Sequence, residues 1–265
     1  MENLFKVILI ITFLFALSFT TFAQTNKTDE KAEAIFQIAY QKLGGANLLQ
    51  VKNQVSTGLF SVIADGSAQL PNSFVDVIVF PDKERTEFKQ QGNKVIQTNF
   101  GEKGWVYDAA KLDIREQGQN EIENFKRGIR TSLDALFRGT WRGQGATLTY
   151  AGKREAGLGK RNDVLKLTYS DGFVVEYEFS QTDGMPMKSI YKKKNDDGTE
   201  IKEEDRYAQF VEMQGVLVPF IVDHYTDGKQ TSRINYEKIE INKKVPDSIF
   251  DKPSDVKSLK KDLKF

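Results

Sequence analysis

DGFVVEYEFSQTDG, residues 171–184, is an alternating apolar and polar segment enclosed by two Asp-Gly pairs. Four apolar side chains occupy every second position: Phe173, Val175, Tyr177 and Phe179. A period of two is typical of a β-strand with one buried face, and Asp-Gly is a strong signal for a tight hairpin turn. The segment therefore predicts a strand that is entered and left through antiparallel hairpins.

The same turn signal recurs along the chain. Asp-Gly pairs begin at positions 65, 171, 183, 197 and 227, between runs rich in aromatic and β-branched residues. No helix-length pattern separates the strands after Asp171, which favours an antiparallel meander over a parallel sheet. Residues 74–80 and 216–222 are mainly apolar on both faces of the predicted strands. Pro219 inside the second run predicts a bulge or an edge, as in an open rather than a closed sheet.

Two amphipathic helices interrupt the strands. Residues 28–43 have Thr28 as the expected N-cap and are followed by Gly44 and Gly45, which favour a helix end. A second helix is predicted over residues 120–137. Its single apolar stripe consists of Ile122, Phe125, Ile129, Leu133, Leu136 and Phe137. Each stripe predicts a helix that packs on the sheet.

The N-terminal segment is typical of an export signal. Lys6 precedes an apolar run over residues 7–17, and Ala23 supplies the small residue expected before a cleavage site. The run is short for the ~20 residues of a membrane-spanning helix. We expect residues 1–23 to be removed and residues 24–265 to form a single domain. Because Gln24 follows the cut, and not a cysteine, we expect a periplasmic protein without a lipid anchor.

Composition excludes several classes of function. The formal net charge of +1 provides no strong field for nucleic acid, so we expect no nucleic-acid partner. The absence of cysteine removes disulfides, thiol nucleophiles and cysteine-ligated zinc. Aromatic residues make up 11% of the chain, with 19 phenylalanines, which suits a sheet with a broad apolar face.

Catalytic residues are scarce. The single histidine is His224, and its neighbour Asp223 would point to the opposite face of a strand, so no adjacent acid is available to orient it. We therefore expect no catalytic residue, no metal and no cofactor. Trp141, between Arg138 and Arg142, is interpreted as part of an exposed turn, with an anionic headgroup site as the alternative.

Several segments, in order along the chain, resemble a known family. They are 79–83 (VFPDK) followed by Arg85, 100–108 (FGEKGWVYD), 215–219 (GVLVP) and 245–250 (VPDSIF) followed by Pro253. This set is similar to outer-membrane lipoprotein carriers of the LolA type and to lipoprotein-sorting relatives. The resemblance implies an open half-barrel of roughly eleven antiparallel strands, with helices over its concave apolar face. Phe80 stands where the family commonly has a basic residue involved in transfer.

These observations together predict a soluble periplasmic carrier that holds lipoprotein acyl chains or other lipids in an apolar cavity. It would be a monomer and would exchange its cargo with partners at the inner and outer membranes. The expected cavity residues are Phe80, Trp105 and Tyr107 from the matched strands, and Phe125, Ile129 and Leu133 from the second helix. One alternative is an envelope sensor or structural subunit that binds a protein partner through the same half-barrel. A hydrolase with two facing carboxylates is the other.

Overall fold

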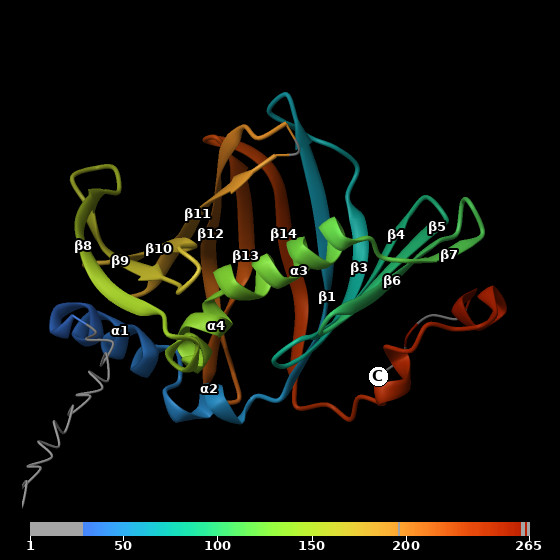
Figure 1. Ribbon diagram of the computed structural model, residues 1–265, viewed down its shortest axis with the longest axis horizontal. Coiled ribbons are helices and arrows are strands. Elements are labelled where there is room, and N and C mark those ends of the chain that lie inside the picture. The colour runs from blue at the N-terminus through green and yellow to red at the C-terminus, as the bar shows by residue number, and fades with distance from the viewer. Residues whose placement is uncertain (1–28, 196, 261–262, 264–265) are drawn as a thin grey trace, which may run out of the picture.

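The computed structural model describes residues 29–195, 197–260 and 263. The predicted signal peptide, Gln24 and Thr28 lie outside these residues. Most of the described chain forms one curved antiparallel sheet (Figure 1). The strands of its first half are β1 (Asn53–Ala64), β2 (Ser67–Ala68), β3 (Asn72–Val79), β4 (Lys83–Gln90), β5 (Asn93–Phe100), β6 (Lys103–Asp108) and β7 (Asp113–Glu116). Those of the second are β8 (Thr147–Glu155), β9 (Arg161–Thr168), β10 (Val174–Ser180), β11 (Pro186–Lys194), β12 (Glu200–Met213), β13 (Val216–Thr226) and β14 (Lys229–Ile241).

The strand order shows two meanders joined in the middle. It runs β7-β6-β5-β4-β3-β1-β14-β13-β12-β11-β10-β9-β8, and the short β2 pairs with β1. The sheet is open, because β7 and β8 lie at its two ends, which confirms the predicted half-barrel of antiparallel strands. The predicted number of strands was wrong, since the sheet has 14 strands and not eleven. The excess includes β2, with 2 residues, and β7, with 4 residues, which are too short to leave a periodic pattern.

The alternating segment forms β10 as predicted. Val175, Tyr177 and Phe179 are buried on its inner face. Glu178 on the other face is also fully buried, whereas the pattern predicted a largely wet face. Its carboxylate accepts hydrogen bonds from Arg154 on β8 at 2.9 Å and from Asn162 on β9 at 2.8 Å. Side chains from neighbouring strands thus take the place of the water molecules that a solvent-exposed Glu178 would contact.

The two edge strands of the sheet, β8 and β7, have different features along their unpaired sides. At β8, the backbone N–H of Asp29 donates to the carbonyl of Leu148 at 3.2 Å, and the Tyr150 N–H donates to the Asp29 carboxylate at 3.3 Å. The register of β8 shifts between Tyr150 and Gly152, and charged residues follow the shift. At the other end, β7 carries a charged residue at three of its positions: Asp113, Arg115 and Glu116.

The helices occupy the concave side of the sheet (Figure 1). They are α1 (Glu30–Lys42), α2 (Ala46–Gln50), α3 (Gln119–Thr131) and α4 (Leu133–Arg138), followed by a 3₁₀ turn at Thr140–Gln144. Two further 3₁₀ turns, Asp247–Ile249 and Val256–Lys260, belong to the C-terminal segment. The N-cap of α1 is Asp29, which accepts from the N–H groups of Lys31 and Ala32. The predicted helix over 120–137 is two helices, because Ser132 is extended, with ψ 155°, and its hydroxyl caps α4. No helix in the described ranges is long and apolar enough to cross a membrane.

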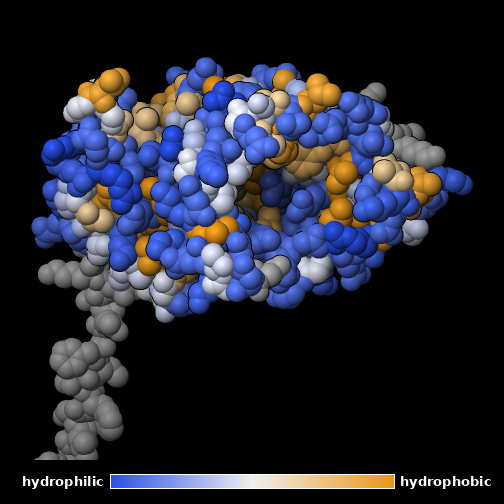
Figure 2. All heavy atoms as spheres, turned by 90° about the horizontal axis from the view of Figure 1, so that it is seen from above, coloured by the Kyte–Doolittle hydropathy of each residue, from blue (hydrophilic) through white to orange (hydrophobic). Residues whose placement is uncertain are grey.

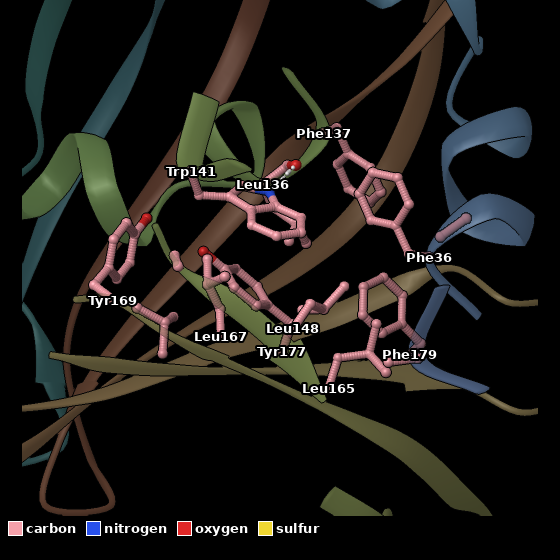
Figure 3. Packing of buried hydrophobic residues seen from close by; sticks show 14 of the residues in the cluster. Phe36, Leu136, Phe137, Trp141, Leu148, Leu165, Leu167, Tyr169, Tyr177 and Phe179 are labelled. Carbon is pink, nitrogen blue, oxygen red and sulfur yellow. Dashed lines mark hydrogen bonds between the residues drawn. The ribbon is translucent and has the colours of Figure 1, made fainter. Parts of the chain in front are cut away.

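The main core lies where α1 and α4 meet the β8–β10 part of the sheet (Figure 3). Phe137 stacks on Phe36 with ring centroids 5.5 Å apart, and it contacts Phe179 edge-on at 6.3 Å. Trp141 is 1% exposed and donates its indole N–H to the Leu136 carbonyl at 2.9 Å. The interpretation of Trp141 as part of an exposed turn was therefore wrong, because the 3₁₀ turn after α4 directs the indole into this core.

Pro219 lies where the sheet is locally interrupted. β13 pairs with β14 only from Ile221 to Thr226, so Pro219 is paired on one side alone, with Phe210 of β12. This confirms the predicted local edge, since proline has no N–H to donate to a second neighbour.

Candidate functional site: a cavity under helix α3

A cavity of about 710 Å³ lies between the concave face of the sheet and the helices α3 and α4. Figure 1 shows α3 crossing the open side of the sheet, and Figure 2 shows a hollow with apolar side chains at its border. Sheet residues that supply apolar surface are Ile78, Phe80, Phe88, Val218, Tyr236 and Ile239. The volume falls within the range of pockets that hold small-molecule ligands.

Helix α3 contributes its apolar stripe to this cavity. Phe125 and Ile129 line it, and Leu133 at the start of α4 extends the same wall. Gly128 lies between them, and a Cβ added there would have no atom within 4 Å. Only Ile122 and Thr131 of α3 are buried. The helix therefore covers the cavity while leaving space between itself and the sheet.

Ion pairs attach α3 to the rest of the protein. Arg115 of β7 contacts Glu121 at 2.7 Å, and Lys126 contacts Glu102 at 2.6 Å. Both guanidinium NH₂ groups of Arg130 donate to the Asp171 carboxylate at 2.8 Å.

The Arg130 contact also includes aromatic rings. Its guanidinium carbon lies 4.1 Å from the Tyr169 ring centroid and 4.7 Å from that of Phe173. The hydrogen bonds from Arg130 lower the pKa of Asp171 to about 2, helped by the Phe173 N–H. The Arg130–Asp171 pair thus attaches α3 through two charged hydrogen bonds and through cation–π contacts with two rings.

The structure brings four of the six sequence-predicted residues together. Phe80, Phe125, Ile129 and Leu133 line the cavity. Phe80 also lies beneath Arg138 of α4, whose guanidinium carbon is 3.7 Å from the ring centroid. A basic group thus lies over Phe80, although it comes from a helix and not from the strand. No signal in the strand itself indicates this arrangement.

Trp105 and Tyr107 lie on the opposite face of the sheet. Trp105 pairs with Thr98, which pairs with Arg85 of β4, and directly opposed residues share one face. The adjacent row, with Gly104, Asn99 and Glu84, is the one that faces the cavity. Trp105 and Tyr107 are buried, but on the outer face of the sheet and not in the cavity wall where they were predicted.

The C-terminal segment covers this outer row. The indole N–H of Trp105 donates to the Phe250 carbonyl at 2.8 Å, and Leu259 packs in the same apolar cluster. Glu87 is 1% exposed and is paired with Arg85 at 2.6 Å and Lys94 at 3.2 Å. The outer face is therefore a closed packing interface with a buried ionic network.

The cavity also has an acidic part. Burial raises the pKa of Glu84 to about 8, and the nearby charge of Asp76 adds to this effect. Burial likewise raises the pKa of Asp76 to about 6, although its carboxylate accepts a hydrogen bond from Thr86 at 2.8 Å. Burial and the charges of these two carboxylates raise the pKa of Tyr236. At neutral pH the Glu84 side chain is thus largely uncharged.

His224 has an acidic partner that the search of adjacent residues missed. Its Nδ1 contacts the carboxylate of Asp205 on β12, and both residues line the cavity. Burial opposes the charged ring, but the hydrogen bond and charge of Asp205 outweigh it and raise the pKa of His224. The β12–β13 turn is at Gln214 and Gly215. Counting equal numbers of residues away from this turn along both strands places Asp205 opposite His224. The register of the hairpin was therefore the signal that could have identified this pair.

The geometry around His224 does not resemble a nucleophile–base pair. Ser189 lies opposite Asp205 in the sheet, but it is fully buried and its hydroxyl is hydrogen-bonded to Tyr207 at 2.9 Å. A serine nucleophile requires contact with the histidine itself. In the part of the chain that the structure describes, no group of three or more histidine or acidic residues is arranged to hold a metal ion.

Comparison with known proteins identifies the fold. No protein-family model matches the chain, and no curated protein matches its sequence. A LolA superfamily protein from Nitrosomonas europaea superposes with a TM-score of 0.52 at 15% identity, covering 83% of this chain and 97% of that chain. The chain has a LolA-type fold.

Two further structures share the LolA-type fold with this chain. A putative outer membrane lipoprotein-sorting protein domain from Vibrio parahaemolyticus has a TM-score of 0.54 at 11% identity, covering 83% of this chain and 97% of that chain. A DUF1329 family protein from Desulfovibrio piger has a TM-score of 0.58 at 14% identity, covering 84% and 98%. At these identities the likeness is one of fold, and the roles of individual residues rest on the geometry of this chain.

Proposed function

We propose that this protein binds lipid acyl chains in the cavity under α3 and carries them across the periplasm. The observation that carries the proposal is an apolar cavity of about 710 Å³ covered by a helix that is attached largely through ion pairs. Each acyl methylene removed from water contributes about 0.8 kcal/mol. An apolar container is therefore sufficient to hold a lipid without any catalytic group.

The proposal includes the location of the protein. Export through residues 1–23 and the presence of Gln24 at the new N-terminus would leave residues 24–265 as a single unanchored domain. Such a monomer can exchange cargo with partners at the inner and outer membranes. It needs no cofactor, because the cargo is moved and not chemically changed.

Substitutions of Gly128 test cavity binding directly. Gly128 lines the cavity, and a Cβ at this position meets no atom within 4 Å, so Gly128→Trp adds an indole at the cavity wall. Displacing three acyl methylenes would weaken binding by about 2.4 kcal/mol, on the order of 50-fold. Gly128→Ala is the matched control, because it adds only a methyl group and favours the helix by about 1 kcal/mol.

The measurement uses protein exported from cells that express the full chain. Lipid that co-purifies is identified by mass spectrometry, and a fluorescent acyl probe is titrated into delipidated protein. We expect lipid and probe to bind to the wild type and Gly128→Ala, and probe binding to be about 50-fold weaker in Gly128→Trp. Wild-type protein that carries no lipid and binds no probe would contradict the proposal and favour a protein-binding role for the half-barrel.

A further inference from the structure

Glu84 is a carboxylate without an ion-pair partner in the wall of the cavity, beside its apolar surface. It lies on β4 between Ile78 of β3 and Asn99 of β5, both of which also line the cavity. Its side chain makes no ion pair or hydrogen bond with any residue that the structure describes. A charged group in such a place is costly unless a partner compensates it.

The other charges of the cavity wall are mostly compensated. Glu121 pairs with Arg115 at 2.7 Å, and Asp134 lies 3.5 Å from the Nε of Arg138, a buried atom that forms an ion pair there but no hydrogen bond. Asp205 contacts His224. Besides Glu84, this leaves only Asp82, in the turn between β3 and β4, without an ion pair in the described chain.

The balance of charge in the wall is acidic. Its acids are Asp82, Glu84, Glu121, Asp134 and Asp205, and its bases are Lys83, Arg138 and His224. Lys83 is also paired outside the cavity, with Asp247 at 3.0 Å. An anionic headgroup would meet this excess of acidic groups, whereas a cation would find an uncompensated carboxylate once Glu84 ionises.

We propose that the cavity selects amphiphiles with a positively charged amine headgroup, which pairs with Glu84 while the apolar tail lies under α3. This inference rests on the proposed lipid-binding function and specifies its ligand class. The ring of Tyr236 lines the cavity close to Asp76 and Glu84, where an aromatic face adds attraction for a cation. Phe125 and Ile129 contact the tail.

Binding of the amine is coupled to the release of a proton. The carboxyl of Glu84, with a pKa of about 8, is mostly protonated at neutral pH, and it must ionise to pair with the cation. Affinity for a permanently charged ammonium should rise with pH, by about tenfold in total, and level off above about pH 8. Asp76 on β3 and Tyr236 on β14 interact electrostatically with Glu84, and Lys83, Asp134, Arg138 and His224 are further charged or titratable groups in the same cavity wall.

These neighbours limit the expected pH profile. Asp76, with a pKa of about 6, contributes a further and smaller rise at lower pH. Tyr236 stays protonated throughout the range because its pKa is raised. Burial raises the pKa of Asp134 although Arg138 lies beside it, and His224, whose pKa is raised by Asp205, lines the same cavity. The part of the rise that Glu84→Gln removes therefore reports on Glu84.

The test compares headgroups on one tail. Calorimetric titration of the full exported protein uses dodecyltrimethylammonium, dodecanoate and dodecyl maltoside below their micelle concentrations, and tetramethylammonium as a headgroup without a tail. Glu84→Gln removes the charge at nearly constant shape. Glu237→Gln removes the same charge from an exposed position next to Tyr236 and is the matched control.

We expect the ammonium amphiphile to bind about tenfold more tightly than dodecanoate at pH 8, and Glu84→Gln to lose this preference and the rise above pH 7. Binding of dodecyl maltoside should change less than twofold in Glu84→Gln, and Glu237→Gln should match the wild type. Equal or tighter binding of dodecanoate, or an unchanged preference in Glu84→Gln, would overturn the headgroup assignment alone. Tetramethylammonium binding as tightly as the amphiphile would also overturn it. If none of the amphiphiles binds, the lipid-binding function itself fails.

Discussion

The contact between Arg130 and Asp171 offers a quantitative test of how α3 is held. Asp171→Asn removes the charge of the partner, but its side-chain oxygen can still accept the Phe173 N–H hydrogen bond, which is 3.0 Å long. The pKa of Asp171 falls from 3.8 to about 2, which corresponds to about 2.4 kcal/mol at 1.36 kcal/mol per unit. Because its side chain is 58% exposed, solvent screening reduces this to about 1 kcal/mol.

The loss should be local. Since Ile122 and Thr131 are the only buried residues of α3, its opening exposes little of the core. Hydrogen exchange measured by mass spectrometry over residues 119–131 should be about fivefold faster in Asp171→Asn, as expected for ~1 kcal/mol. The urea midpoint of global unfolding should hardly change. Asp251→Asn, at an exposed position in the C-terminal segment, controls for the loss of one negative charge.

Acid should reproduce the effect in the wild type. The folded-state pKa of Asp171 is lowered, so its stabilising contribution is complete above about pH 4 and is lost as the pH falls toward about 2. Exchange of α3, corrected for its intrinsic pH dependence, should accelerate over this range in the wild type and not in Asp171→Asn. If α3 exchange is unchanged in the variant while global stability falls, the helix is not held by this pair and the reasoning fails.

Two other predictions concern stability. Trp105→Phe removes the donor to the Phe250 carbonyl and should lower the free energy of unfolding by about 1–3 kcal/mol, with faster proteolysis of residues 245–260. Trp141→Phe, which loses an equivalent bond to Leu136, should destabilise the protein without releasing that segment, and equal proteolysis of the two variants would refute the assignment. Because the pKa of Glu84 is raised to about 8, wild-type stability should decline as the pH rises from about 4.5 to about 8. Urea unfolding of Glu84→Gln should show a flatter profile, and parallel profiles would count against a raised pKa at Glu84.

The strands were predictable where one face is buried and the turns are marked. The segment 171–184 became β10 with its hairpins because alternation and Asp-Gly turns are local signals. The helix over 120–137 was predicted as continuous because its apolar stripe passes through Ser132 without a gap. The break comes from the Ser132 hydroxyl, which caps α4, and a capping serine in the middle of an apolar stripe does not by itself indicate an interruption.

The cavity was only partly predictable for a physical reason. Alternation shows which residues of a strand share a face, but it does not show what covers that face. Trp105 is buried by Phe250, which lies 145 positions away in the sequence, and not by α3. Glu84 gives no signal at all in the sequence, because its significance depends on the absence of a partner among residues from other strands and from α4.

The contacts of Asp29 with β8 have a consequence for aggregation of the protein at high concentration. An open sheet has two unpaired borders onto which a second chain can add a strand, and this is a route to aggregation. Asp29 fills that position at β8 with its own N–H and carboxylate, while the same carboxylate caps α1. Loss of this one side chain would therefore favour self-association of the protein.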